Sequence, residues 1–110
     1  MAVNKMSESV KITMTKDQLQ EYFTKTLNKT FKLLPLREEE VDWSKPLNTL
    51  IEELSGFYLS IESPPLNFCS LIFKLKGLLT YTKKEDFMKY RRTIFECLRL
   101  IQEVQNELIK

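Results

Sequence analysis

Residues 87–108 read FMKYRRTIFECLRLIQEVQNEL, and the spacing of the apolar side chains in this stretch decides the fold class. Apolar residues recur there at alternating steps of three and four: Phe87, Tyr90, Ile94, Cys97, Ile101, Val104 and Leu108. This heptad pattern predicts a long amphipathic helix whose apolar seam faces other helices. Thr82 and Glu85 have the spacing of a capping box, so we expect the helix to begin at that point.

Two earlier helices are predicted from residues that start or stop helical turns. The first is expected to begin at Thr15, which has capping-box spacing to Gln18, and to end at Pro35, because proline cannot continue a helix interior. The second is expected to start near Asp42 or Ser44, since either side chain can cap the first turn.

A third helix is predicted from about Pro65 to Leu79. It is apolar on most of its sides, so we expect it to be the most buried helix of the set. Gly56, inside the second helix, is expected to mark a close contact between helices. Four amphipathic helices with short connections predict an all-α fold, an antiparallel four-helix bundle with a long C-terminal helix.

The chain has 110 residues, which is the length of one domain. We therefore predict a single helical-bundle domain over residues 15–110. Residues 1–14 are predicted to be a flexible or docking N-terminal arm, because Val10, Ile12 and Met14 alternate with polar residues and no second strand is visible to pair with them.

The composition excludes several classes of function. The chain contains no histidine and only two glycines, which excludes histidine-dependent catalysis, histidine metal sites and glycine-rich phosphate loops. The sequence indicates no cofactor. No apolar run is long enough for a signal peptide or a membrane span, so a cytoplasmic protein with no membrane partner is predicted. Cys69 and Cys97 are therefore expected to be reduced, buried core residues.

An acidic loop is predicted between the first two helices. Glu38, Glu39 and Glu40 lie in it beside Trp43, the single tryptophan of the chain. Such a loop is commonly a solvated segment near a helix N-terminus, and a tryptophan at a helix start commonly packs over the core. The alternative is a partner-binding surface with Trp43 as its anchor.

The same region allows a second chemical interpretation. Glu39 and Asp42 have the i, i+3 spacing of helical magnesium sites, and Glu52 and Glu53 follow in the next helix. Such pairs occur in magnesium-dependent, all-α nucleotide hydrolases, although here one pair lies in a loop and the next helix has no clean partner pair. We keep this hydrolase as a further alternative.

Positive charge concentrates in the second half of the chain. Residues 1–62 carry eight basic and ten acidic side chains, net −2, whereas residues 63–110 carry nine basic and five acidic side chains, net +4. Four basic side chains, Lys83, Lys84, Arg91 and Arg92, lie near the start of the last predicted helix, and two of them, Lys84 and Arg91, have no acidic residue at helix-pairing spacing. They are the best candidates for contact with a partner or with phosphate groups.

Two blocks of the sequence resemble small helical proteins of unassigned function that phages and mobile elements of Gram-positive bacteria carry. The blocks are residues 33–38 (LLPLRE) running to Asp42-Trp43, with residues 50–54 (LIEEL) downstream, and residues 90–96 (YRRTIFE). The resemblance spans residues 30–105 and implies an inhibitor or adaptor of host machinery, including anti-defence proteins such as anti-CRISPRs. It contains no defined motif, so it assigns no functional residue.

The sequence thus predicts a non-enzymatic helical interaction protein that binds a protein partner. The surface expected to do so combines the basic start of the last helix with the acidic loop and Trp43. A small nucleic-acid-binding protein is the alternative. The Phe87–Leu108 seam is expected to pack inside the bundle, and a homodimer formed through an extended last helix is the other arrangement kept open.

Overall fold

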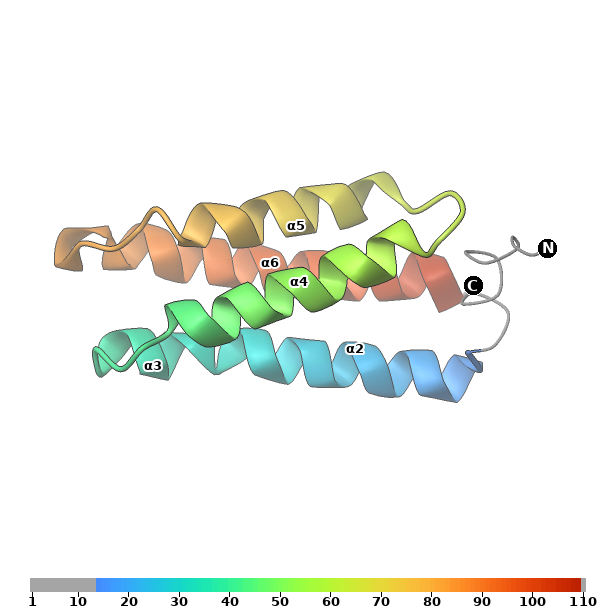
Figure 1. Cartoon of the computed structure of the whole chain (residues 1–110), viewed down its shortest axis with the longest axis horizontal. Helices are drawn as coiled ribbons and strands as arrows, with labels where there is room; N and C mark the ends of the chain where they lie inside the picture. The colour runs from blue at the N-terminus through green and yellow to red at the C-terminus, as the bar shows by residue number, and fades with distance from the viewer. Residues whose placement is uncertain (1–13, 110) are drawn as a thin grey trace.

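The computed structural model of the protein describes residues 14–109, and within that range the regular structure is entirely helical. The elements are α2 (Lys16–Phe31), α3 (Leu33–Glu38), α4 (Ser44–Leu59), α5 (Leu66–Leu78), the short 3₁₀ helix η1 (Lys84–Asp86) and α6 (Phe87–Ile109). The chain reverses direction at each connection between the long helices, which lie side by side (Figure 1). The predicted all-α bundle is confirmed.

The bundle is elongated, with extents of 50 × 22 × 21 Å. α6 is its longest helix, and it packs most extensively against α5 and α2, while α4 packs against α5. The predicted arm lies outside the described residues except for Met14. In the part of the chain that the structure describes, no helix combines the length and the apolar character that a membrane crossing requires.

The first helix starts as predicted but does not end at Pro35. The Thr15 hydroxyl accepts the Gln18 amide at 3.0 Å and the Gln18 side chain accepts the Thr15 amide at 2.9 Å, so the capping box is formed. Helix α2 stops at Phe31, and after Lys32 the chain resumes as α3. Pro35 is the third residue of α3. The N–H groups of a first helical turn have no acceptor within the helix, so a proline, which lacks the N–H, is tolerated there.

The last helix has the predicted seam but a different start. Every seam residue from Phe87 to Leu108 is buried or packs against the core. The predicted capping box at Thr82 is absent from the described hydrogen bonds. Lys83, not Thr82, is the residue that precedes η1, and its side chain makes no cap bond. Val104 and Leu108 pack within their own bundle, so the end of α6 leaves no bare seam for a second copy.

The prediction for the third helix is wrong in one respect. The inner side of α5 is fully buried, as expected, but its outer side exposes Leu66, Cys69 and Phe73. Four helices surround a single core here, so even a helix that is apolar all round keeps one side in solvent. Gly56 is also exposed and a Cβ there would meet nothing within 4 Å, so it marks no close helix contact.

Candidate functional site

One end of the bundle brings together α3, the loop at residues 39–43, η1 and the first turns of α6. We call this the Arg37 end. Arg37 lies on the last turn of α3 and is only 6% exposed. Its Nη2 donates to the carbonyl oxygens of Tyr81 at 3.0 Å and Lys83 at 2.6 Å. The guanidinium therefore fixes the segment that leads into α6 against α3.

Aromatic rings surround the same guanidinium. Its carbon lies 5.2 Å from the Tyr90 ring centroid, 5.6 Å from that of Trp43 and 5.8 Å from that of Phe87. Trp43 in turn meets Tyr90 edge to face, with centroids 5.0 Å apart. Ring faces attract a cation most strongly where water is excluded. Trp43 is thus half-buried in the end of the core, which limits the area that it could offer to a partner.

The Tyr90 hydroxyl is a buried polar group at the centre of this cluster. Its oxygen has no hydrogen-bond partner among the described residues. Burial raises the pKa of Tyr90 above its usual value, and the positive charge of Arg37 opposes that rise. The phenol therefore stays protonated and neutral near neutral pH.

The two charged clusters predicted from the sequence meet at the Arg37 end. Glu38, Glu39 and Glu40 are all exposed, and Glu40 adopts a left-handed backbone conformation with φ of 59°. Its carboxylate forms an ion pair with the Lys84 ammonium at 3.5 Å. Both side chains are largely in solvent, so this pair adds little stability. Its importance is positional, because it joins the acidic loop to the basic start of α6.

The outer face of α6 carries a second group of exposed side chains. Met88 and Phe95 are 62% and 43% exposed, and the Arg91 guanidinium carbon lies 5.0 Å from the Phe95 ring centroid. Arg92 beside them is exposed as well.

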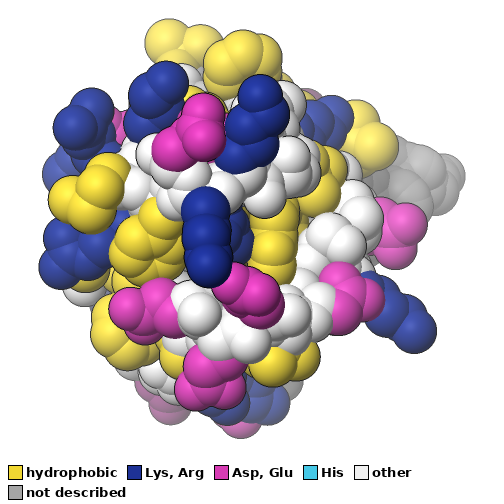
Figure 2. All heavy atoms as spheres, turned by 90° about the vertical axis from the view of Figure 1, so that its left-hand side faces the viewer, with side chains coloured by type: hydrophobic (Ala, Val, Ile, Leu, Met, Phe, Trp, Pro, Cys, Tyr) yellow, Lys and Arg dark blue, Asp and Glu magenta, His cyan; other side chains and the backbone are white. Residues whose placement is uncertain are grey.

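Figure 2 views the Arg37 end and shows lysine and arginine side chains around its upper and left parts, interspersed with hydrophobic ones, and acidic side chains mainly below.

Two of the carboxylates considered for a magnesium site, those of Asp42 and Glu53, have other partners. The Asp42 carboxylate accepts the Ser44 amide at 3.1 Å and the Ser44 hydroxyl at 3.0 Å, and these bonds lower the pKa of Asp42. Glu53 accepts a bond from Lys29 at 3.1 Å. Within residues 14–109 no group of three or more acidic, cysteine or histidine side chains is placed to hold a metal ion.

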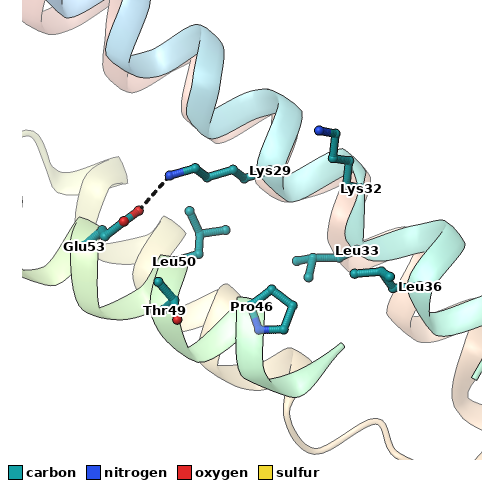
Figure 3. Close-up of a pocket in the computed structure, with 8 residues that line it drawn as sticks. All are labelled: Lys29, Lys32, Leu33, Leu36, Pro46, Thr49, Leu50 and Glu53. Atoms are coloured by element: carbon teal, nitrogen blue, oxygen red, sulfur yellow. Dashed lines mark hydrogen bonds and ion pairs between the residues drawn. The ribbon is translucent and has the colours of Figure 1, made fainter. Parts of the chain in front are cut away.

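A groove of about 370 Å³ lies where α2 and α3 diverge from α4 (Figure 3). Leu33, Leu36, Pro46 and Leu50 form its apolar floor, and the ion pair between Lys29 and Glu53 crosses one end. The groove offers shape and apolar surface. Its described lining includes no cysteine, serine or histidine that could act as a nucleophile.

The two cysteines differ in their surroundings. Cys97 is buried in the α6 seam, and that burial raises the pKa of its thiol to about 12. Cys69 lies exposed on the outer side of α5, which contradicts the prediction that both cysteines are buried. Its position follows from the helix spacing, since Cys69 is three residues after Leu66 and four before Phe73, both exposed.

Comparison with known proteins identifies no relative: no family model, no curated protein and no solved structure matches this chain. The site must therefore be judged on its residues alone. Sequence reasoning assigned no role to Arg37, although it follows Leu33 and Leu34 by four and three residues and so shares their buried face. Met88 and Phe95 lie outside the Phe87–Leu108 seam, so the spacing of the seam does not predict their exposure.

Proposed function

We propose that this chain is a non-enzymatic interaction protein that binds a protein partner through the outer face of α6. The observation that supports this most directly is the cluster of Met88, Arg91 and Phe95. These residues lie on one face by helical spacing, and the two apolar side chains remain exposed beside a guanidinium. Methionine, aromatic residues and arginine are the types enriched at the centres of protein interfaces.

The charges nearby indicate the chemistry of the partner. Arg91 and Arg92 lie on α6, and Lys83 and Lys84 continue the positive charge to the start of η1. A partner surface with acidic side chains around an apolar centre would complement this face. Glu38, Glu39 and Glu40 would then lie at the rim, where they favour one orientation of the partner. An inhibitor or adaptor role, as the sequence resemblance implies, fits such a one-sided surface.

Affinity capture with matched variants tests the proposal. Tagged wild-type protein, Phe95→Glu and the double variant Arg91→Glu/Arg92→Glu would be used on nuclease-treated extract of the cells that make the protein. Leu59→Glu is the control, because Leu59 is 77% exposed at the end of α4, a different helix. We expect a protein held by wild type and control but lost with both α6 variants.

The captured protein would then be purified and titrated against each variant. We expect a dissociation constant at least about tenfold higher for Phe95→Glu, since aromatic residues at interface centres contribute about 2 kcal/mol or more. Equal affinity for wild type and both α6 variants would show that this face does not bind the partner.

Nucleic acid is the second candidate ligand, and the exposed cations of the same face favour it. Anisotropy of labelled single- and double-stranded oligonucleotides across a salt series separates the two cases. Binding through phosphates weakens linearly in the logarithm of salt concentration, with a slope of about 0.9 for each phosphate contacted on duplex DNA. Such a slope, removed by Arg91→Glu/Arg92→Glu, would replace the protein-partner proposal with a nucleic-acid one.

A further inference from the structure

The outer face of α5 is a second apolar surface, separate from that of α6. Leu66 is 90% exposed and Phe73 is 77% exposed, so both large side chains stand almost fully in solvent. Ser70 and Gly77 lie on the same face by helical spacing. Along the helix, this face thus alternates large and small uncharged residues: Leu66, Ser70, Phe73 and Gly77.

Gly77 has no explanation within its own chain. It lies inside α5 and does not adopt a positive φ, so it is not a left-handed helix cap. A Cβ at this position would meet nothing within 4 Å, so no neighbouring helix needs the space. Glycine inside a helix costs about 1 kcal/mol relative to alanine. Gly56 on α4 has the same open space, so the space alone indicates no contact, but at Gly77 it lies on the same helix face as the exposed Leu66 and Phe73.

We propose that the outer face of α5 binds the same face of a second copy of this chain, with the two α5 helices antiparallel. Leu66 and Phe73 are seven residues apart, as are Ser70 and Gly77. Reversing the helix therefore sets Leu66 against Gly77 of the second copy and Phe73 against Ser70 of the second copy. Each large side chain then meets a small one across a two-fold axis, the self-complementarity that a symmetric dimer requires.

The charges along α5 favour the same orientation. Lys76 is exposed in its second half, whereas Lys74 beside it pairs with Glu96 of α6 at 3.1 Å; α5 contains no acidic residue, and Glu62 lies just before its start. A parallel pair would place the lysines of the two copies side by side, where like charges repel. The antiparallel pair places the basic half of each helix toward the end of the other that carries Glu62, so the charges are complementary.

The size of the face sets the strength to expect. A helix of 13 residues is about 20 Å long, so its outer face falls short of the roughly 800 Å² per partner of a standard stable interface. We therefore expect a weak dimer that dissociates on dilution. Phe95→Glu should leave it unchanged, so this inference can fail or hold independently of the proposed function.

Sedimentation equilibrium of the purified full chain, from about 1 µM to about 500 µM, tests the dimer. Wild type should pass from monomer to dimer, and Phe73→Glu and Gly77→Gln should each raise the dissociation constant at least about tenfold. The matched controls are Phe31→Glu, an exposed phenylalanine on α2, and Gly56→Gln, an exposed glycine with open space around it on α4. Both controls should dimerise like wild type.

A reciprocal exchange tests the antiparallel register. Leu66→Gly should weaken the dimer by removing the large side chain, and Gly77→Leu should weaken it by filling the space that receives that side chain. The combined variant should recover most of the affinity, because each Leu placed at 77 then faces a Gly at 66 of the second copy. No such recovery is possible in a parallel pair, so its absence would overturn the register.

Three other results would overturn the proposal. Wild type could remain monomeric at all concentrations, or form a dimer that Phe73→Glu leaves intact. A monomer whose free energy of unfolding falls with Phe73→Glu would show that another part of the same chain covers the face. Circular dichroism of each variant, measured at low concentration, separates a lost contact from a lost fold.

Discussion

The guanidinium carbon of Arg37 lies 5.2 Å from the centroid of the Tyr90 ring, and the two residues join α3 to α6 at one end of the bundle. A buried arginine is ordinarily paired with a carboxylate. Here the bonds shown are to the carbonyl oxygens of Tyr81 and Lys83, with aromatic rings around the cation. Both bonds are donated by one nitrogen, Nη2, while three aromatic rings lie around the planar guanidinium, a shape that the compact ammonium of lysine lacks.

Arg37→Lys should therefore destabilise the protein by about 2–4 kcal/mol, because it removes the planar cation that the rings surround and leaves a compact, strongly hydrated ammonium buried in its place. Urea denaturation followed by the fluorescence of Trp43, the single tryptophan, measures the change directly. Arg91→Lys is the matched control, since that arginine is exposed, and it should shift stability by less than about 0.5 kcal/mol. Equal effects of the two substitutions would refute a special role for Arg37.

The sequence predicted the helices well where the apolar spacing was long and regular, as in the Phe87–Leu108 seam. It failed where a tertiary contact competes with a local signal. Thr82 has capping-box spacing, yet the chain there is held by bonds from Arg37 to the carbonyls of Tyr81 and Lys83. Pro35 looked like a helix stop, yet a break at Lys32 places it in a first turn where proline is tolerated.

The candidate site was less predictable than the fold. Both charged clusters were identified from the sequence, but their proximity was not, because Glu40 and Lys84 are distant in the chain and meet only after the bundle forms. Exposure of Phe73 and Phe95 also depends on how four helices share one core. Helical spacing assigns a side chain to a face of its helix, and the packing of the neighbouring helices decides whether that face is covered.

The buried thiol of Cys97 should make the protein less stable in alkali. Its pKa is raised to about 12 in the folded chain, above the ordinary value of 9.0. Between these values the unfolded chain loses a proton that the folded chain keeps. The contribution of this thiol to stability is therefore unchanged below about pH 9 and falls as the pH rises above it. At pH 10 this group lowers the free energy of unfolding by about 1 kcal/mol relative to pH 7.

Urea denaturation of wild type and Cys97→Ala at pH 7 and pH 10 checks this effect. Between pH 7 and pH 10, the free energy of unfolding should fall less in Cys97→Ala than in wild type, by about 1 kcal/mol. The pKa of Tyr22 is also raised, to about 12, by burial, and its contribution appears in both proteins and cancels. Parallel pH profiles for the two proteins would contradict the assignment to Cys97.

Two buried threonines in α2 show how a polar residue can replace an apolar one in the core. The Thr30 hydroxyl donates to the Thr26 carbonyl at 2.8 Å, and Thr26 does the same to the carbonyl of Tyr22 at 2.9 Å. Since each hydroxyl is satisfied within its own helix, the methyl groups can face the core. Phe31, the next residue along α2, is 52% exposed although it is apolar.

Thr30→Val should therefore change the free energy of unfolding by less than about 1 kcal/mol, because valine keeps the shape and the helix still uses the Thr26 carbonyl. Thr30→Ala should be more destabilising, by about 1–2 kcal/mol, since it also leaves space in the core. Thermal or urea unfolding of both variants measures the order. Equal destabilisation of the two variants would mean that the hydroxyl, which both lack, matters more than the space left in the core.

Gly56 offers the clearest route to a more stable protein. It lies inside α4, it is exposed, and a Cβ there would meet no atom within 4 Å. Gly56→Ala should raise the free energy of unfolding by about 0.5–1 kcal/mol, because alanine restricts the unfolded chain and favours the helix. Glu52→Ala, one turn earlier on the same helix, is the control and should change stability by less than about 0.5 kcal/mol. Urea denaturation of the two variants decides the matter. A loss of stability in Gly56→Ala alone would mean that a neighbour occupies the space beside Gly56 in solution.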